Sequence, residues 1–409
     1  MPALSQRALA LQGHASPLVT AHFRIADDPW HPQRNPGGYM NLGTAENYLL
    51  WDRIGARLQQ APALGEHDVH YDLLHGSTET RRVIAGLMQQ THRCEIEPEQ
   101  LVLVAGASAA LDILAQLLCE PGDGVLVSAP YYAGFEGDFG ARADARLIPV
   151  RAANPRQLHA QLDDYERALA AARDAGQAVR ALLVCSPHNP LGISLGKEEI
   201  VELIEFAHRH DLQLIFDELY AGSVYGERPF VSARALAPDD PQVHSVYGLA
   251  KDFGLSGFKF GVLHSVNPEL LAAARQLAQL APVSTGTQQQ LRWLLGDAQW
   301  NQQTLDCNRQ RLASARAQLQ QRMDALAVPL LASDAAVYVW LDLRQHLERA
   351  DFDAELALFQ RCLDLGKVGI SPGSAFNCVE PGYFRLCFAR DSAALDHGVD
   401  GLARALGLS

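Results

Sequence analysis

The sequence contains no apolar run long enough to cross a bilayer and no surplus of basic residues. No stretch of about 18 apolar residues occurs. Lysine and arginine total 34 against 47 acidic residues, a formal net charge of −13, whereas nucleic-acid binding depends chiefly on clustered cations. The first residues also lack the apolar core of a signal peptide. We therefore expect a soluble, cytoplasmic protein with neither a nucleic acid nor a membrane as its partner.

Cysteine is present, but not in the pattern of a metal site or a disulfide framework. The seven cysteines are an odd number, none forms a CxxC pair, and several lie in apolar runs such as ALLVCSP at 181–187. We expect buried free thiols and no metal ion. The chain also shows no internal repeat and no low-complexity segment.

The order of apolar segments predicts a large α/β domain. From about residue 100 to 265, short apolar runs alternate with helical patterns, which is typical of a mostly parallel sheet covered by helices. The predicted strands are 101–106, 125–130, 146–150, 181–187, 212–219, 244–249 and 260–265.

The remainder of the chain predicts a smaller α+β domain. A long helix is expected over 308–326, followed by a strand in VYVWLDL, a helix and a strand in YFRLCFA. The apolar positions of the long helix are Leu312, Leu319, Met323 and Leu326. We predict an N-terminal segment, 1–45, that packs on the small domain or on a partner subunit, a large domain, 46–300, and a small domain, 301–409.

Small or polar residues follow several predicted strands. AGASAALD at 105–112 is a turn into a helix whose free N–H groups can hold a phosphate, although such junctions are also common without a ligand. In SPHNPLG, Asn189 lies where ligands of such sheets bind, although asparagine before proline also starts turns for local reasons.

Two further segments bring charge to strand ends. In FDELY, Asp217 ends an apolar strand, and a protonated pyridine nitrogen would give this carboxylate a partner. In GLAKDFGLSGFKFG, Lys251 follows an apolar strand, and a desolvated lysine is a usable nucleophile. An isolated lysine would more often lie on the surface, but four such motifs at strand ends, in one chain order, favour a functional lysine in a site that they share. The protonated pyridine nitrogen would be that of pyridoxal 5'-phosphate (PLP).

The four motifs in this order resemble the class I/II aminotransferases of PLP fold type I, over about residues 40–390. Within that group, NLGTAENYL, LLHGSTETRRVIAGLM, PYYAGFEGDF and SPGSAFNCVEPGYFRLCFA are similar to segments of 1-aminocyclopropane-1-carboxylate synthase-like enzymes. The resemblance implies the aspartate aminotransferase-like α/β fold, with a seven-stranded, mostly parallel sheet in the large domain and a smaller α+β domain. It also implies a homodimer with shared active sites.

The resemblance implies roles for individual residues. Lys251 would be the Schiff-base lysine and proton shuttle, Asp217 the partner of the pyridine nitrogen, and Asn189 and Tyr220 donors to the ring hydroxyl. The other cofactor-binding positions would be Tyr132 on the ring and Ala107, Ser108, Lys259 and the neighbouring subunit's Tyr71 at the phosphate. Arg385 would bind the substrate α-carboxylate through a bidentate pair.

Four positions depart from the family pattern. Lys259 replaces a common arginine, and Gly248 and Ala250 replace common serines. Lysine neutralises phosphate as a point charge but lacks the planar fork of arginine. Leu74 replaces the tyrosine that cyclopropane-forming enzymes carry before His-Gly.

The resemblance implies an enzyme that acts on an L-amino acid through an external aldimine and α-deprotonation, and we expect amino-group transfer. The alternative is γ-elimination, replacement or cyclisation of a cationic amino acid such as S-adenosylmethionine or an arginine-like substrate. Glu46 aligns with an acidic residue near the sulfonium in the synthases, although a glutamate at a helix N-terminus is an equally good interpretation. A ligand sensor of the same fold is disfavoured, because no DNA-binding extension is present and both Lys251 and Asp217 are.

Overall fold

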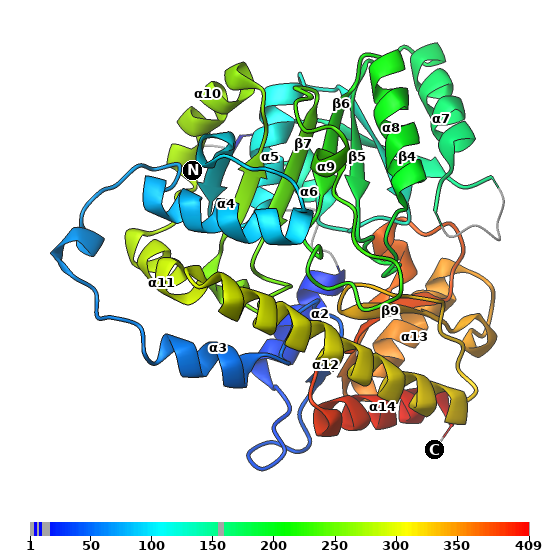
Figure 1. The fold of residues 1–409 in the computed structure, drawn as a ribbon. Coiled ribbons are helices and arrows are strands. Elements are labelled where there is room, and N and C mark those ends of the chain that lie inside the picture. Colours follow the sequence, from blue (N-terminus) through cyan, green and yellow to red (C-terminus); the bar gives the residue numbers. More distant parts are fainter. Residues whose placement is uncertain (1–3, 6–7, 10–16, 154–158, 409) are drawn as a thin grey trace.

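The computed structural model describes residues 4–5, 8–9, 17–153 and 159–408. The predicted N-terminal segment therefore lies partly outside the described residues. The chain forms two packed units, with the larger in the upper half of Figure 1 and the smaller below it.

The larger unit is built on one seven-stranded sheet with the order β2-β8-β7-β6-β5-β3-β4. Neighbouring strands are parallel except that β8 runs antiparallel to both β2 and β7. The strands are β2 Leu101–Val104, β3 Gly124–Ala129, β4 Arg146–Arg151, β5 Val179–Cys185, β6 Gln213–Asp217, β7 Val243–Gly248 and β8 Gly261–His264. The predicted seven-stranded, mostly parallel sheet is confirmed, with strand limits that differ by a few residues.

Helices cover both faces of this sheet because its strands are apolar on both sides. In β3, Val125 and Val127 pack on one side of the sheet, and Leu126 packs on the other. The first side carries α5 Ala107–Leu118, α6 Phe135–Gly140 and α10 Pro268–Leu277. The second carries α7 Leu162–Asp174, α8 Lys197–Arg209, α9 Ala233–Leu236 and, beside β2, α4 Thr78–His92 and α11 Thr285–Leu295.

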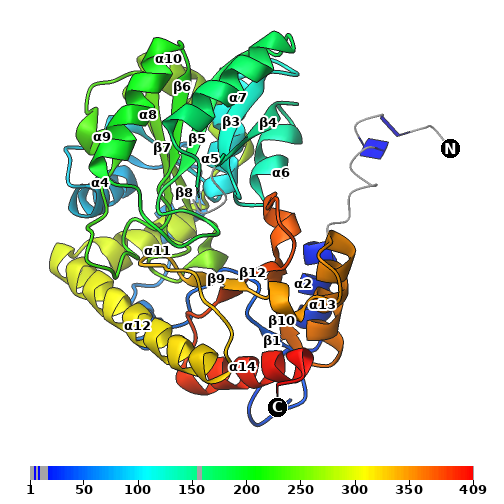
Figure 2. The ribbon, with the colours of Figure 1, turned by 90° about the vertical axis from the view of Figure 1, so that its right-hand side faces the viewer.

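The smaller unit combines an antiparallel three-stranded sheet with helices. Its elements are β9 Tyr338–Asp342, β11 Ser371–Pro372, β12 Tyr383–Cys387, α13 Phe352–Asp364 and α14 Ser392–Leu406. N-terminal elements join it, since β1 Met40–Asn41 pairs with β10 Val368–Gly369, and α2 Pro17–Asp27 lies beside α13 in Figure 2. The exact domain limits stay a prediction.

One long helix, α12 Ala298–Ala325, connects the two units. The predicted start at 308 was wrong, because the Asp297 side chain caps the helix by accepting from the backbone N–H groups of Gln299 and Trp300, and the first turns are polar. Leu312, Leu319 and Met323 pack in the core of the smaller unit, as their spacing predicted. The short elements are α3 Trp51–Leu58 and the 3-10 helices Glu66–Val69, Pro98–Gln100, Ser256–Phe258, Ala278–Leu280, Arg344–His346 and Gly373–Phe376.

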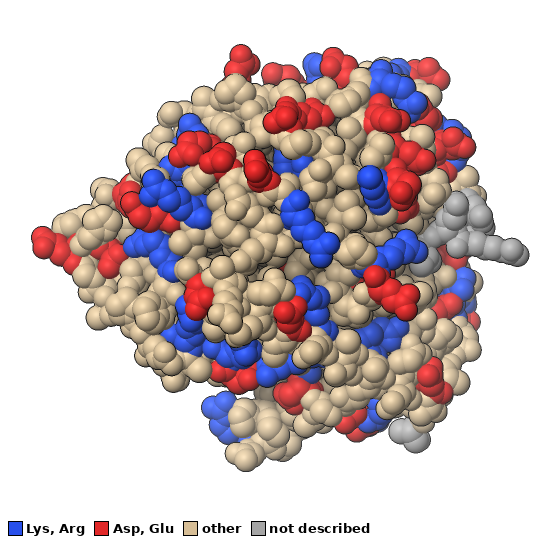
Figure 3. All heavy atoms as spheres, viewed as in Figure 1, with Lys and Arg blue, Asp and Glu red and all other residues tan. Residues whose placement is uncertain are grey.

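The surface is charged without a basic patch on the face seen in Figure 3, where acidic and basic side chains are interspersed. Within the described residues, no helix has both the length and the apolar character needed to span a bilayer. All seven cysteines are free, and Cys119, Cys185, Cys362 and Cys387 are buried. The cytoplasmic location expected from the sequence stays a prediction.

Candidate active site

A cavity of about 380 Å³ lies between the larger sheet and the smaller unit. Its wall includes the turn into α5, the ends of β6 and β7, part of β12 and the N-terminal helix α2. The structure therefore brings together most of the residues predicted from the sequence. Those that line the cavity are Ala107, Ser108, Tyr132, Asn189, Asp217, Tyr220, Lys251, Lys259 and Arg385.

Lys251 enters the cavity from the segment that follows β7. Its Nζ donates a hydrogen bond of 2.6 Å to the backbone oxygen of Ala45. Burial, together with the nearby Arg385 guanidinium, lowers the pKa of the Lys251 amine to about 8. About a tenth of this amine is therefore unprotonated at pH 7, far more than for an ordinary lysine, and the unprotonated form is the one that acts as a nucleophile or base.

Asp217 is the last residue of β6 and is only 6% exposed. One carboxylate oxygen accepts from the Leu219 backbone N–H at 3.2 Å, and the other lies 3.8 Å from the Cys185 thiol. Burial raises the pKa of this carboxyl to about 7. Because no described residue forms an ion pair with Asp217, a cationic group in the cavity would compensate its charge.

Arg385 lies on strand β12 and carries a positive charge, opposite in sign to that of Asp217. It is 5% exposed and donates to the Asn189 side-chain oxygen at 3.0 Å and to the Gly43 carbonyl at 2.7 Å. Its Nε has no partner among the described residues, and none of their carboxylates pairs with the guanidinium. The site thus presents a buried cation suited to a ligand carboxylate.

Asn189 and Tyr220 are also buried at this end of the cavity, at 4% and 2% exposure. Since the Asn189 oxygen already accepts from Arg385, its Nδ2 is oriented to donate elsewhere. The Tyr220 ring packs edge-on against Tyr338, and the Tyr132 ring packs edge-on against Phe135. These contacts fix aromatic and amide groups beside the two unpaired charges.

The turn into α5 forms the other end of the cavity. Gly106 has a φ of +108°, which favours glycine, and precedes the free N–H groups at the start of the helix. Gly261 of β8 packs directly on this turn, because a Cβ at Gly261 would lie 2.3 Å from the Gly106 carbonyl carbon. Ser108 and Lys259 flank the turn and are exposed.

Sequence reasoning missed two components of the cavity. Asp138 of α6 lines it, has a buried and unpartnered Oδ2, and has its pKa raised to about 6 by burial. Asp138 lies in the segment PYYAGFEGDF, which is similar to a synthase segment, and its acidic side chain there could have indicated a site residue. Helix α2 contributes Leu18, His22 and Ile25, and nothing in the local sequence indicates this long-range placement.

Two predicted site residues do not line the cavity of their own chain. The Glu46 carboxylate accepts a hydrogen bond of 2.6 Å from the Tyr48 hydroxyl, and the cavity wall contains its neighbours Thr44 and Ala45 instead. Tyr71 is 98% exposed. The roles predicted for both residues stay predictions.

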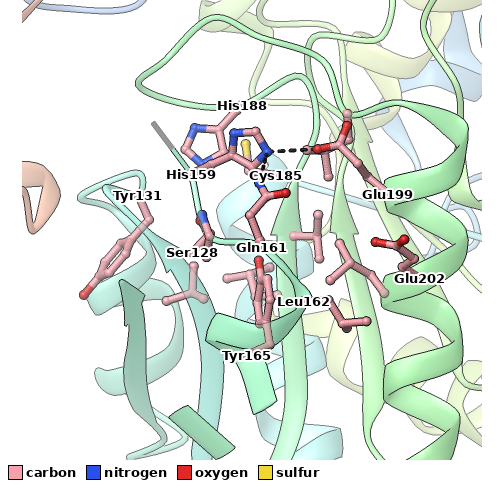
Figure 4. Close-up of a pocket in the computed structure, with 16 residues that line it drawn as sticks. Ser128, Tyr131, His159, Gln161, Leu162, Tyr165, Cys185, His188, Glu199 and Glu202 are labelled. Carbon is pink, nitrogen blue, oxygen red and sulfur yellow. Dashed lines mark hydrogen bonds and ion pairs between the residues drawn. The ribbon is translucent and has the colours of Figure 1, made fainter. Parts of the chain in front are cut away.

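A second, smaller cavity lies beside His188, between strands β3 and β5 and helices α7 and α8 (Figure 4). Its volume of about 30 Å³ accommodates water but no metabolite. His188 is 4% exposed with an unpartnered Nδ1, and burial lowers its pKa to about 3, so its ring is neutral. His159 pairs with Glu199 at 3.0 Å across the same wall.

The larger cavity fits PLP in three respects. The unpaired carboxylate of Asp217 suits a protonated pyridine nitrogen, and the amine of Lys251 suits an aldehyde. The glycine-lined turn before α5 suits a phosphate. Asp217 ends strand β6, Lys251 lies in the segment that follows β7, and the turn leads into α5.

Comparisons with known proteins agree with this fit. The aminotransferase class I and II family matches residues 38–402. A 1-aminocyclopropane-1-carboxylate synthase 6 from Oryza sativa subsp. japonica is 33% identical and aligns with 95% of this chain and 76% of its own. A synthase from Nicotiana tabacum is 32% identical over 92% of this chain and 80% of its own.

Solved structures show the same fold. Aspartate aminotransferase from Thermus thermophilus with maleate has a TM-score of 0.81 at 23% identity and covers 99% of this chain and 100% of its own. An aromatic aminotransferase from Pyrococcus horikoshii has a TM-score of 0.78 at 21% identity, with 90% and 95% covered. The predicted aspartate aminotransferase-like fold is confirmed, and the chain belongs to the class I and II aminotransferases, a family of PLP-dependent enzymes.

Proposed function

We propose that this enzyme transfers the amino group of an L-amino acid to a 2-oxo acid. The observation that carries the proposal is the pair of buried, unpaired charges, Asp217 and Arg385, on one cavity with the Lys251 amine. A carboxylate for a pyridine nitrogen, an arginine for a substrate carboxylate and a deprotonatable lysine are the groups that such a transfer needs.

At the reactive end of the cavity, Lys251 and Asp217 would hold or move protons, and two neighbouring residues would hold the cofactor ring. When bound, PLP supplies an electron-withdrawing ring that stabilises negative charge at the substrate α-carbon. Lys251 would attach the cofactor through Nζ and, once released, carry the α-proton, since its pKa near 8 permits both protonation states. Asp217 would hold a proton at the pyridine nitrogen, and Asn189 and Tyr220 would donate to the ring hydroxyl.

Substrate binding falls to Arg385. Its two Nη groups contact the Asn189 side chain and the Gly43 carbonyl, so the guanidinium has a fixed plane in the cavity wall. A carboxylate bound bidentately there would place the α-carbon in a defined orientation. The Tyr132 ring would pack on the cofactor ring.

At the phosphate end, the Ala107 backbone, Ser108 and Lys259 would hold the cofactor phosphate. We propose that Tyr71 completes this end from a second copy of the chain in a homodimer. Tyr71 is 98% exposed, and Trp51 and Val69 are each 70% exposed. Apolar side chains so exposed are typical of a surface that another protein covers.

A second candidate is elimination, replacement or ring closure at the γ-carbon of a cationic amino acid. The curated relatives named as 1-aminocyclopropane-1-carboxylate synthases favour it, at 33% identity over 95% of the chain. Glu46 would then face the substrate cation, which requires its carboxylate to leave the hydrogen bond from Tyr48. Leu74, in place of the synthase tyrosine, favours amino-group transfer.

The fate of the amino nitrogen distinguishes the two reactions. The PLP-loaded enzyme is incubated with ¹⁵N-labelled amino acids, including arginine and S-adenosylmethionine, together with an unlabelled 2-oxo acid. Amino-group transfer predicts ¹⁵N in the amino acid formed from that 2-oxo acid. Recovery of ¹⁵N as ammonium or in a cyclic amino acid, with none in the acceptor, would overturn the proposal in favour of γ-carbon chemistry.

A further inference from the structure

A buried chain of hydrogen bonds runs behind Lys251 on the side away from the cavity. The Asn47 Nδ2 donates to the Lys251 backbone oxygen at 3.0 Å and to the Asn308 side-chain oxygen at 2.8 Å. Asn308 in turn donates to the Ser223 hydroxyl at 3.2 Å. The backbone of the lysine is thereby connected to the long helix α12 and to the turn that follows Tyr220.

The chain of hydrogen bonds ends at Asp252, the residue after Lys251. Its carboxylate accepts from the Ser223 hydroxyl at 2.6 Å, from the Gly222 backbone N–H at 2.8 Å and from the Tyr247 hydroxyl at 3.0 Å. Asp252 is fully buried, and burial raises its pKa to about 6. Three donors on one buried carboxylate form a rigid support, because a buried acid without them would be costly.

We propose that Asn47, Asn308, Ser223 and Asp252 form a positioning network that fixes the backbone of Lys251 and so holds its amine in the cavity. Residues from four separate segments converge on this one lysine, and all four are at most 6% exposed. None of them lines the cavity, so they act through Lys251. The inference rests on the proposed role of Lys251.

The surroundings of the Lys251 amine indicate that the network controls the pKa of this amine. Burial and the Arg385 guanidinium disfavour the charged form of Lys251, whereas Cys387, Glu46 and Asp217 favour it to a smaller extent. A loosened backbone would let Nζ reach water and move away from Arg385. The protonated form would then become easier to form, and the pKa of Lys251 would rise.

The test measures the pKa of Lys251 in the cofactor-free protein by competitive acetylation across pH, with peptide-level mass spectrometry. The chain contains only four lysines, so Lys197 and Lys367 serve as internal references. In Asn308→Ala we expect the pKa of Lys251 to rise by about one unit. Ser223→Ala should produce a smaller rise, and it serves as the test if Asn308→Ala does not fold.

Asn301→Ala is the matched control, because Asn301 is a buried asparagine of the same helix that donates to the Leu295 carbonyl instead. It should reduce thermal stability but leave the pKa of Lys251 unchanged. An unchanged pKa in folded Asn308→Ala and Ser223→Ala proteins would overturn the network. Failure of PLP to attach to Lys251 in the wild-type protein would instead overturn the proposed function, whatever the acetylation shows.

Discussion

The two ends of the large cavity are built in different ways. At the end that would receive the cofactor ring, Asn189, Asp217, Tyr220 and Arg385 are at most 6% exposed and are fixed by strands or by the segments after them. At the phosphate end, Ser108 and Lys259 are exposed. The side chains at the ring end are thus buried, whereas those at the phosphate end are open to solvent.

This difference in burial indicates that the ring end determines the reaction, whereas the phosphate end affects how tightly PLP would bind. Buried charges without protein partners are strongly destabilising, so the ring end is retained for its function rather than for stability. The phosphate end would rely on backbone N–H groups and on an exposed lysine, whose ion pair with a phosphate would be weakened by solvent. Substitutions at the ring end should therefore have the larger effects.

The largest effect is expected for Lys251→Ala. If Lys251 moves the α-proton, as we propose, its loss should reduce kcat by at least about 10³-fold. Lys259→Ala is the matched change at the phosphate end, and it should mainly raise the Kd for PLP. Steady-state kinetics at saturating PLP separate the two. Equal losses of kcat in both variants would remove the distinction between the ends.

Arg385→Ala should have the second-largest effect and lower kcat/KM about 100-fold. The guanidinium would pair with the substrate carboxylate, and the loss of one partner from a buried charge pair typically costs several kcal/mol. We expect most of the loss in KM and little change in PLP affinity. Arg390→Ala is the control, because Arg390 packs over Tyr48 and does not line the cavity. If Arg385→Ala loses PLP rather than substrate affinity, the assignment of Arg385 to the substrate is wrong.

Asp217→Asn should stabilise the cofactor-free protein at alkaline pH while weakening PLP binding. Burial raises the pKa of Asp217 from its ordinary value to about 7, so the folded state binds its proton more tightly than the unfolded state does. The cost of ionising it therefore grows as pH rises from about 4 to 7.

We expect the free energy of unfolding of Asp217→Asn to exceed that of the wild-type protein by on the order of 2 kcal/mol at pH 8. The gain should disappear below about pH 3, where the carboxyl is protonated in both the folded and the unfolded state. Urea unfolding of the two proteins at a series of pH values measures it. A gain that does not depend on pH would show that the buried charge of Asp217 is not its source.

The smallest effect concerns the missing hydroxyls of the phosphate end. Ala250 lines the cavity, so Ala250→Ser can add a donor and should tighten PLP binding by up to about tenfold, the value of one hydrogen bond. Gly248→Ser is the contrasting change, because a Cβ there would meet the Phe260 backbone oxygen at 3.0 Å. Titration of the cofactor-free proteins with PLP should show tighter binding for Ala250→Ser alone.

Much of the fold and of the cavity could be predicted from local sequence. The β6 strand ends at Asp217 in an apolar run, and Lys251 and Asn189 likewise follow apolar strands, so their convergence follows from the edge of a parallel sheet. The start of α12 could not be predicted from apolar spacing, because its first turns are polar and its cap is Asp297.

Long-range contacts were the part that the sequence did not reveal. The sequence predicted that residues 1–45 pack on the small domain or on a partner subunit, but it did not place helix α2 on the cavity or pair β1 with β10. The contact between Asn47 and Asn308 joins residues 261 positions apart. The hydrogen bond from Tyr48 to Glu46 likewise depends on rotamers that spacing does not specify.

The attachment of PLP to Lys251 can be tested directly, because the roles proposed for the other residues depend on it. The PLP-loaded protein is treated with borohydride, digested and mapped by mass spectrometry over the four lysines of the chain. We expect the reduced cofactor on Lys251 alone, with Lys197, Lys259 and Lys367 unmodified. Attachment to Lys259 in place of Lys251, or a cofactor that remains removable by dialysis after reduction, would contradict it.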